Sequence, residues 1–523
     1  MHGVRGFVLC DIDWISMRLE MRRAGILFPI FSLPSSYGIG TLGEESYKFV
    51  DFLSDAGQSI WQILPLGPTG YGDSPYQSFS SFAGNPYFID LETLIADGLL
   101  MKEECDAVDF GDNPADIDYE KLYFGRFKLY RKAYDNAKKR GDLASKKYKS
   151  FCKENESWLG DYALYMAVKD SFGGVNFMEW DEDIRLRDKK AVAEYSKKYA
   201  DEIGCYCYMQ YLFNQQWTKL KKYANKKGIE IIGDIPIYVA FDSADTWANP
   251  SLFQLDAKGW PTAVAGCPPD CFTADGQLWG NPLYKWAEHK NTGYAWWLNR
   301  MKRCFELYDI VRIDHFRGFD EYWAVPYGDK TAVGGKWLKG PGYNLFAAIN
   351  KEFGTGRIIA EDLGFITDSV RNMIKKAGYP GMKVLQFAFD ESKNSEHLPH
   401  FCDKNYVVYT GTHDNFTIKA WVEQMDKKSA KFAKKYMNVK KRKQLPKAYI
   451  RAAMGTASDT CVIPLQDYME LGNEARINAP STLGINWRWR VEADMLTAKL
   501  AKEIKKYAVT YGRAPQKAKK KEQ

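Results

Sequence analysis

The sequence DIVRIDHFRG at residues 309–318 decides the fold. Its apolar first half predicts a short buried strand, and its polar second half predicts the loop that leaves this strand, where parallel α/β proteins keep their chemistry. Side chains alternate along a strand, so Arg312 and Asp314 share a face. The guanidinium would keep the carboxylate ionised, as a nucleophile must be. A purely structural ion pair at the end of a strand explains these two residues equally well.

Two later strands end in the same way. The stretch RIIAEDLG at residues 357–364 runs from apolar residues to Glu361, and the stretch YVVYTGTHDN at residues 406–415 runs from apolar residues to Asp414. In a parallel barrel the carboxyl ends of the strands converge on one face, which would bring these acids close to Asp314. Two carboxyl groups that flank a scissile bond, one ionised and one protonated, are the minimum apparatus of glycoside cleavage.

Strands alternate with helical segments along the chain, which predicts a (β/α)8 TIM barrel. The expected strands are 24–30, 59–66, 229–239, 382–389 and 461–465, together with the apolar parts of 309–318, 357–364 and 406–415. Residues 91–228 have a charged helical pattern too long for one barrel helix, so they predict an inserted helical subdomain. No strand-rich pattern follows the last expected strand, which predicts that a separate C-terminal β-sandwich is absent.

The domain organisation follows from these elements. The catalytic barrel is expected at residues 23–510, with cleft loops at 67–86 and 259–285 that are rich in Gly, Pro and aromatic residues. The remaining segments are an N-terminal extension at 1–22 and a basic, disordered tail at 511–523.

Composition excludes several classes of function. The net charge of +7 comes partly from the terminal lysines, and the Lys-rich residues 427–447 indicate a solvated helix and not a nucleic-acid site. No segment is long and apolar enough to span a membrane, and no secretory signal is recognisable.

Ten irregularly spaced cysteines indicate free thiols in a reducing cytoplasm, and no metal-binding pattern accompanies Cys205 and Cys207. The 16 Trp and 33 Tyr residues suit either a core or stacking on sugar rings.

The three acidic stretches, in this order, resemble the amylomaltases, the 4-α-glucanotransferases of glycoside hydrolase family 77 in the α-amylase superfamily. The resemblance runs from about residue 24 to residue 490, where RINAP (476–480) and NWRWR (486–490) match the closing signature of the family. It implies that Asp314 is the nucleophile, Glu361 the acid/base and Asp414 the stabiliser of the transition state. It also implies that the remaining polar groups beside them contact the sugar or orient the nucleophile, namely Arg312, His315 and His413.

The resemblance adds further substrate contacts. Ser74 and Tyr76 lie in an SPYQS segment that lines the acceptor side of the cleft in the family, although a Pro-fixed turn with a packing tyrosine is the alternative. Asp234 matches an acidic position that shapes the floor of the site, although it could instead cap a helix. Residues 265–282 resemble a mobile loop over the cleft, in which Cys271 replaces the tyrosine of the family. The contacts expected from this loop are Asp270, Phe272, Gln277, Trp279 and Asn281.

The implied reaction is a retaining double displacement. A segment of an α-1,4-glucan passes to the enzyme and then to the 4-hydroxyl of another glucan or of glucose, with no metal or organic cofactor. The expected partners are α-1,4-glucans and maltooligosaccharides, and the sequence does not indicate an oligomeric state. An α-amylase-like hydrolase uses the same carboxylates and remains the alternative, while a non-catalytic glucan-binding barrel would be expected to lack one of them.

Overall fold

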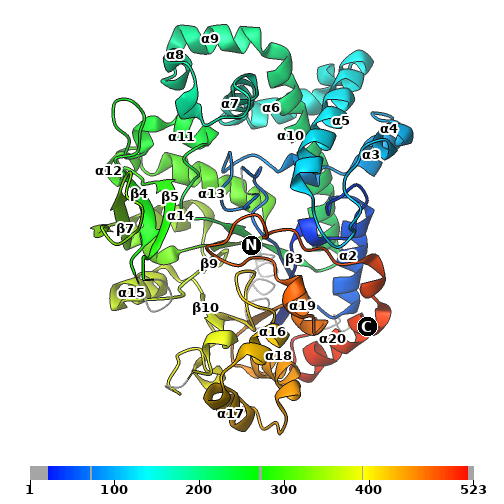
Figure 1. The fold of residues 1–523 in the computed structure, drawn as a ribbon, viewed down its shortest axis with the longest axis vertical. Coiled ribbons are helices and arrows are strands. Elements are labelled where there is room, and N and C mark those ends of the chain that lie inside the picture. The colour runs from blue at the N-terminus through cyan, green and yellow to red at the C-terminus, as the bar shows by residue number, and fades with distance from the viewer. Residues whose placement is uncertain (1–21, 71–72, 270–273, 391–392, 516–523) are drawn as a thin grey trace, which may run out of the picture.

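The computed structural model describes residues 22–70, 73–269, 274–390 and 393–515, and its centre is a sheet of eight parallel strands (Figure 1). These strands are β1 (Arg23–Leu27), β2 (Ile60–Gln62), β3 (Glu230–Ile235), β6 (Ile310–Ile313), β9 (Ile358–Ala360), β10 (Gly381–Val384), β11 (Tyr406–Tyr409) and β12 (Thr460–Pro464). Their order in the sheet is β10-β11-β12-β1-β2-β3-β6-β9. The N–H of Ala360 in β9 donates to the carbonyl of Pro380, directly before β10, at 2.9 Å. The predicted (β/α)8 barrel is therefore confirmed.

The interior of the barrel is filled by one apolar side chain or more from each strand. Because neighbouring side chains along a strand point to opposite faces, a single residue such as Ile310 faces inward while Val311 packs against the outer helices. The buried inner cluster consists of Leu27, Ile60, Ile232, Ile310, Ile359, Met382, Val384, Val407, Tyr409 and Val462. This packed interior holds the strand ends, and the polar groups that follow them, in fixed positions.

Several strands are shorter than the sequence predicts. The second strand ends at Gln62 and not at Leu66, and the predicted strand 382–389 turns at Leu385–Phe387 into a short 3-10 helix. The continuation at 63–66 is apolar and buried, and the one at 385–389 is largely so, although Gln386 is polar and Phe387 is exposed. A mainly apolar run therefore does not by itself distinguish a strand from a connection.

The chain between β2 and β3 is helical, and helices also cover the rest of the barrel. Figure 1 shows α5 to α9 gathered at one end of the molecule and α16 to α18 at the other. The helices after β2 are α3 (Leu91–Ala96), α4 (Lys102–Asp106), α5 (Tyr119–Arg140), α6 (Lys146–Glu154), α7 (Leu159–Ser171), α8 (Glu182–Arg185), α9 (Lys189–Lys198) and α10 (Ala200–Lys226). The others are α2 (Glu44–Asp55), α11 (Ala244–Ala248), α12 (Trp286–Asn291), α13 (Ala295–Leu307), α14 (Tyr343–Phe353), α15 (Asp368–Ala377), α16 (Ile418–Gln424), α17 (Lys427–Tyr436), α18 (Leu445–Gly455), α19 (Leu465–Tyr468) and α20 (Ala498–Thr510).

A second, antiparallel sheet lies beside the barrel, and the sequence did not predict it. It consists of β4 (Ala263–Cys267), β5 (Gln277–Pro282), β7 (Glu321–Pro326) and β8 (Lys336–Lys339), in the order β5-β4-β7-β8. A loop was expected at 259–285, because this segment is rich in Gly, Pro and aromatic residues. The strands form because they pair with partners distant in the sequence, and that pairing overrides local propensity.

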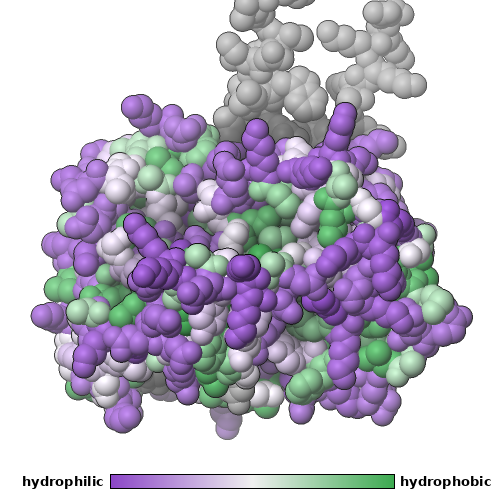
Figure 2. Space-filling model, turned by 90° about the horizontal axis from the view of Figure 1, so that it is seen from above, coloured by the Kyte–Doolittle hydropathy of each residue, from purple (hydrophilic) through white to green (hydrophobic). Residues whose placement is uncertain are grey.

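On the face drawn in Figure 2, hydrophilic residues predominate and hydrophobic residues lie in small patches between them. Within the described residues, every helix is too short or too polar to cross a lipid bilayer.

His289 in α12 is fully buried, and its ring lies within 5.2 Å of the Tyr284 ring and 5.3 Å of the Trp286 ring. Burial lowers its pKa from 6.5 to about 4. The imidazole of His289 therefore binds a proton more readily in the unfolded chain than in the folded one. Its contribution to the stability of the fold is complete above pH 6.5 and is lost as the pH falls from 6.5 towards 4.

Replacing His289 with Phe is therefore expected to reduce the acid sensitivity of the fold. The loss in free energy of unfolding between pH 7 and pH 5, measured with urea, should be smaller by about 2 kcal/mol than in the wild type. The same replacement at the exposed His400 is the control and should leave that loss unchanged. An equal loss in both variants would contradict the prediction.

Candidate active site

The three predicted carboxylates all follow strands of the barrel at its carboxyl end. Asp314 comes directly after β6, Glu361 directly after β9, and Asp414 follows β11. The strands β6 and β9 are neighbours in parallel register, with Ile313 opposite Ala360. The fold therefore places the first two carboxylates on adjacent strand ends.

Arg312 joins two acids beneath the site. Its guanidinium is almost completely buried and donates to Asp234 at 2.6 Å and to Asp314 at 2.7 Å. The sequence predicted the second of these ion pairs. Burial raises the pKa of Asp234, and the positive charge of Arg312 opposes that rise. The guanidinium therefore fixes the position of the Asp314 carboxylate and places a positive charge beside it.

The surroundings of Glu361 favour the neutral form of its carboxyl group. Burial raises its pKa to about 8, and the negative charge of Asp314 adds to this effect. Its two oxygens accept backbone N–H groups, one from His315 at 2.7 Å and one from Leu363 at 2.8 Å. Because the His315 N–H belongs to the residue after Asp314, this bond ties the two carboxylates together. Burial beside Asp314 therefore favours the protonated form of Glu361, and the two N–H groups oppose this effect without cancelling it.

Asp414 is held as an anion. Burial alone would raise its pKa, but His413 at 3.3 Å and the Asn478 amide, which donates at 2.6 Å, bring the pKa down to about 2. Burial disfavours the charged form of His413, yet Asp414 raises the pKa of that ring. The backbone carbonyl of Asp414 also accepts from Arg476 at 2.8 Å. The three carboxyl groups thus differ in environment, which is the condition for giving them different roles.

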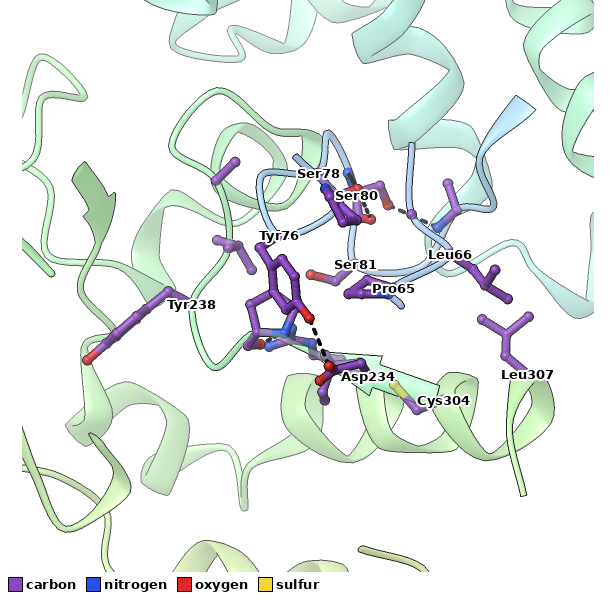
Figure 3. Close-up of a pocket in the computed structure, with 18 of the residues that line it drawn as sticks. Pro65, Leu66, Tyr76, Ser78, Ser80, Ser81, Asp234, Tyr238, Cys304 and Leu307 are labelled. Carbon is purple, nitrogen blue, oxygen red and sulfur yellow. Dashed lines mark hydrogen bonds between the residues drawn. The ribbon is translucent and has the colours of Figure 1, made fainter. Parts of the chain in front are cut away.

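Tyr76 closes the floor of the site. Its hydroxyl donates to Asp234 at 2.8 Å, as Figure 3 shows, and lies 2.9 Å from Nε2 of His413. Since the hydroxyl gives its one hydrogen to Asp234, Nε2 donates to the Tyr76 oxygen, and the same nitrogen lies 3.3 Å from the Asp414 carboxylate. The two rings are also stacked, with centroids 5.3 Å apart. Asp234 therefore shapes the floor by hydrogen bonding, and behind it lies a cavity of about 40 Å³ that Tyr76 and Tyr238 help to line.

His315 and Trp279 meet at one side of the carboxylates. The backbone of His315 has a φ of 50°, a left-handed conformation that turns its N–H towards Glu361. Its ring packs edge-on against Trp279 with centroids 4.8 Å apart. Burial lowers the pKa of His315 to about 4, although Asp314 favours its protonation. The ring is therefore neutral at pH 7.

The other predicted contacts are distributed over the two loop segments. Gln277 accepts the indole N–H of Trp279 at 3.0 Å and so orients that ring. Asn281 is buried, with its amide group donating to Val239 and accepting from Gln77. The hydroxyl of Ser74 accepts the Tyr76 N–H at 3.3 Å, which shapes the turn that carries Tyr76. Asp270 and Phe272, and with them Cys271, lie outside the described residues.

Two residues of the site were missed as contacts. Asn478 binds Asp414, and the Trp487 ring lies 5.9 Å from the Tyr76 ring and 6.0 Å from the His413 ring. Both belong to the segments RINAP and NWRWR, whose resemblance to the family was the only signal in the sequence. Within the described part of the chain, no group of three or more His, Cys, Asp or Glu side chains is arranged to hold a metal ion.

Comparisons with known proteins agree with this geometry. The sequence profile of the family described as 4-alpha-glucanotransferase matches residues 28–497. The 4-alpha-glucanotransferase of Streptococcus pneumoniae serotype 4 is 48% identical over 481 residues, 92% of this chain and 95% of that protein. The chloroplastic/amyloplastic 4-alpha-glucanotransferase of Solanum tuberosum is 40% identical over 514 residues, 96% of this chain and 88% of that protein.

Among solved structures, an amylomaltase from Streptococcus agalactiae in complex with acarbose has a TM-score of 0.91 and 40% identity, covering 94% of this chain and 100% of that chain. An amylomaltase from Corynebacterium glutamicum has the same fold, with a TM-score of 0.72 at 18% identity and coverage of 95% and 75%. Since the profile spans most of the sequence and the relatives match over nearly their whole length, the chain belongs to the 4-alpha-glucanotransferase family, glycoside hydrolase family 77.

Proposed function

We propose that the protein transfers a segment of one α-1,4-glucan to the 4-hydroxyl of another glucan or of glucose by a retaining double displacement. One observation carries the proposal: a buried Glu361 with a pKa of about 8 lies beside an Asp314 carboxylate that Arg312 holds at 2.7 Å. A protonated acid next to an ionised carboxylate is the pair that glycoside cleavage with retention requires.

Each carboxyl group has one task in this reaction. Asp314 attacks the anomeric carbon, while Glu361 gives its proton to the leaving glycosidic oxygen, so that a glycosyl-enzyme forms and the reducing-end fragment departs. Glu361, now ionised, takes the proton from the acceptor hydroxyl, which attacks the same carbon and releases Asp314. The Asp414 carboxylate binds the sugar hydroxyls more strongly as positive charge develops on the ring.

Transfer and hydrolysis share these steps up to the glycosyl-enzyme. Water resolves this intermediate in a hydrolase, and a sugar hydroxyl resolves it in a transferase. Aromatic and hydrogen-bonding groups on the two cleft segments, such as Trp279 and Tyr76, favour binding of a sugar acceptor. We place the enzyme in the cytoplasm, which the buried free thiols of Cys105, Cys304 and Cys461 support.

Incubation of the purified protein with maltotriose tests the proposal. Longer maltooligosaccharides together with glucose, and little gain in total reducing ends, are expected. A rise in reducing ends without longer products would instead identify a hydrolase, and no conversion would contradict both functions.

The pH dependence should follow Glu361. Its proton is needed in the first step, so kcat/KM for maltotriose is expected to fall above pH 8, by about tenfold per pH unit. The fluoride of α-maltosyl fluoride leaves without a proton. With this donor, the rate of the glycosylation step should therefore not fall above pH 8. A flat kcat/KM profile for maltotriose between pH 7 and pH 10 would contradict the assignment of the acid.

Replacing Tyr76 with Phe should weaken the floor of the site. The change removes a hydrogen bond to the charged Asp234 and a contact with His413, so kcat/KM for maltotriose should fall by about 10- to 100-fold. Tyr409→Phe is the matched control, because that hydroxyl lies inside the barrel and donates to the neutral Gln62 at 2.9 Å. Equal losses in the two variants would show that the effect of Tyr76→Phe is structural.

A further inference from the structure

A second cavity, of about 280 Å³, lies between the inserted helices and the barrel. Trp158 and Asp161 line it from the side of α7, Asp245 lines it from α11, and Trp296 and Asn299 line it from α13. None of the three carboxylates of the active site contributes to it. Since ligand sites typically measure about 300–1,000 Å³, this cavity suits one small ligand and not a long chain.

The floor of the cavity is aromatic. Trp158, Trp296 and Phe82 are all at least nine-tenths buried. The Phe82 ring lies 6.4 Å from the Trp158 ring in a stacked arrangement and 6.0 Å from the Trp296 ring in an edge-on arrangement. Large aromatic surfaces of this kind bind the apolar face of a ring-shaped ligand.

The mouth of the cavity is polar. Ser157, Thr292 and Asn299 are exposed there, and the amide of Asn299 makes no hydrogen bond in the part of the chain that the structure describes. In the floor, the buried indole N–H of Trp296 likewise has no acceptor among the described residues. The cavity thus combines an apolar aromatic face with hydrogen-bond donors and acceptors that have no partner in the described part of the protein. This combination suits a ring-shaped ligand that carries several hydroxyl groups.

The charges around the cavity exclude other ligand classes. Among the described residues, no Lys, Arg or His lines it, so the lining offers a phosphate group no positive partner. Asp161 is paired with Arg187 at 2.8 Å. Asp245 accepts the Ser81 N–H at 2.7 Å, and burial raises its pKa to about 6. Neither acid therefore offers an isolated charge to an amine, and a neutral ligand is favoured.

We propose that this cavity is a non-catalytic binding site for one or two glucosyl units of an α-1,4-glucan. The choice of glucose over other neutral sugars rests on the proposed function, whereas the class of a neutral sugar rests on the cavity itself. Phe82 and Ser81 follow Tyr76 in the same loop, so a bound sugar would contact the segment that carries the floor of the active site. Occupancy would stiffen that loop.

Fluorine NMR of the full-length protein labelled with 5-fluorotryptophan tests the proposal. The signals of Trp158, Trp296 and Trp279 are assigned with single Trp→Phe variants, and maltose is titrated into the Glu361→Gln protein, in which turnover is suppressed. The signals of Trp158 and Trp296 are expected to move together along one saturation curve, while Trp279 reports separately on the active site.

Two matched variants locate the ligand. Asn299→Trp fills the mouth of the cavity and should weaken the response of Trp158 by at least about tenfold, a change of 1.4 kcal/mol in binding. Asn291→Trp makes the same change at an exposed position outside the cavity and should have no effect. Identical titrations in both variants, a response to tetramethylammonium instead of maltose, or no movement of Trp158 and Trp296 would each overturn the proposal. A response at these two residues with none at Trp279 would support the cavity and count against the proposed function.

Discussion

Replacing Asp314 with Asn is expected to lower the rate of maltotriose disproportionation by about 10⁴-fold or more, as when other catalytic nucleophiles are removed. The neutral amide cannot attack the anomeric carbon, and no glycosyl-enzyme can form. The rate is measured from the initial appearance of glucose and of longer oligosaccharides. Circular dichroism checks that the barrel remains folded.

The matched control flanks the same strand at its other end. Asp309 stands at the opposite end of β6 and accepts the Ile231 N–H at 2.8 Å, a bond that an Asn side-chain oxygen can also accept. Asp309→Asn should therefore keep nearly the activity of the wild type. A comparable loss in both variants would contradict the assignment of the chemistry to the carboxyl end of the barrel.

Replacing Glu361 with Gln is expected to lower the same rate by about 10²- to 10⁴-fold. Gln keeps the shape of the side chain but has no proton to give, and its single amide oxygen can accept only one of the two N–H groups, from His315 or from Leu363. The loss in rate therefore combines acid/base catalysis with a smaller effect on positioning, and a donor with a different leaving group separates the two.

The leaving group separates the roles of Glu361 and Asp314. With α-maltosyl fluoride as donor, fluoride departs without a proton, so the glycosyl-enzyme should form at a nearly normal rate in Glu361→Gln. Asp314→Asn should remain inactive with this donor. Failure of the fluoride to restore the first step in Glu361→Gln would reassign that residue, and restoration in Asp314→Asn would exclude it as the nucleophile.

The sequence predicted the parts of the fold that depend on local pattern. An apolar run closed by an acid was enough to locate β6, β9 and β11 and to place Asp314, Glu361 and Asp414 on one face of a barrel. The ion pair between Arg312 and Asp314 followed from the alternation of side chains along a strand. These features need only neighbouring residues.

The features that the sequence did not predict depend on distant contacts. The antiparallel sheet forms because Ala263 pairs with Pro326, and the bond from Asn478 to Asp414 joins two segments that only the closed barrel brings together. The raised pKa of Glu361 likewise depends first on its burial, which no stretch of residues reveals. Local propensity does not determine such pairings.

The antiparallel sheet has a consequence for the evolution of specificity. One of its two edge strands, β5, carries Gln277 and Trp279, and within the described residues it pairs with β4 alone in the order β5-β4-β7-β8. A strand with one paired edge can change length or side chains with less effect on the rest of a sheet than a central strand can. The residues of β5 that we propose as sugar contacts can therefore diversify, or be engineered, while the strand ends that hold the three carboxylates stay the same.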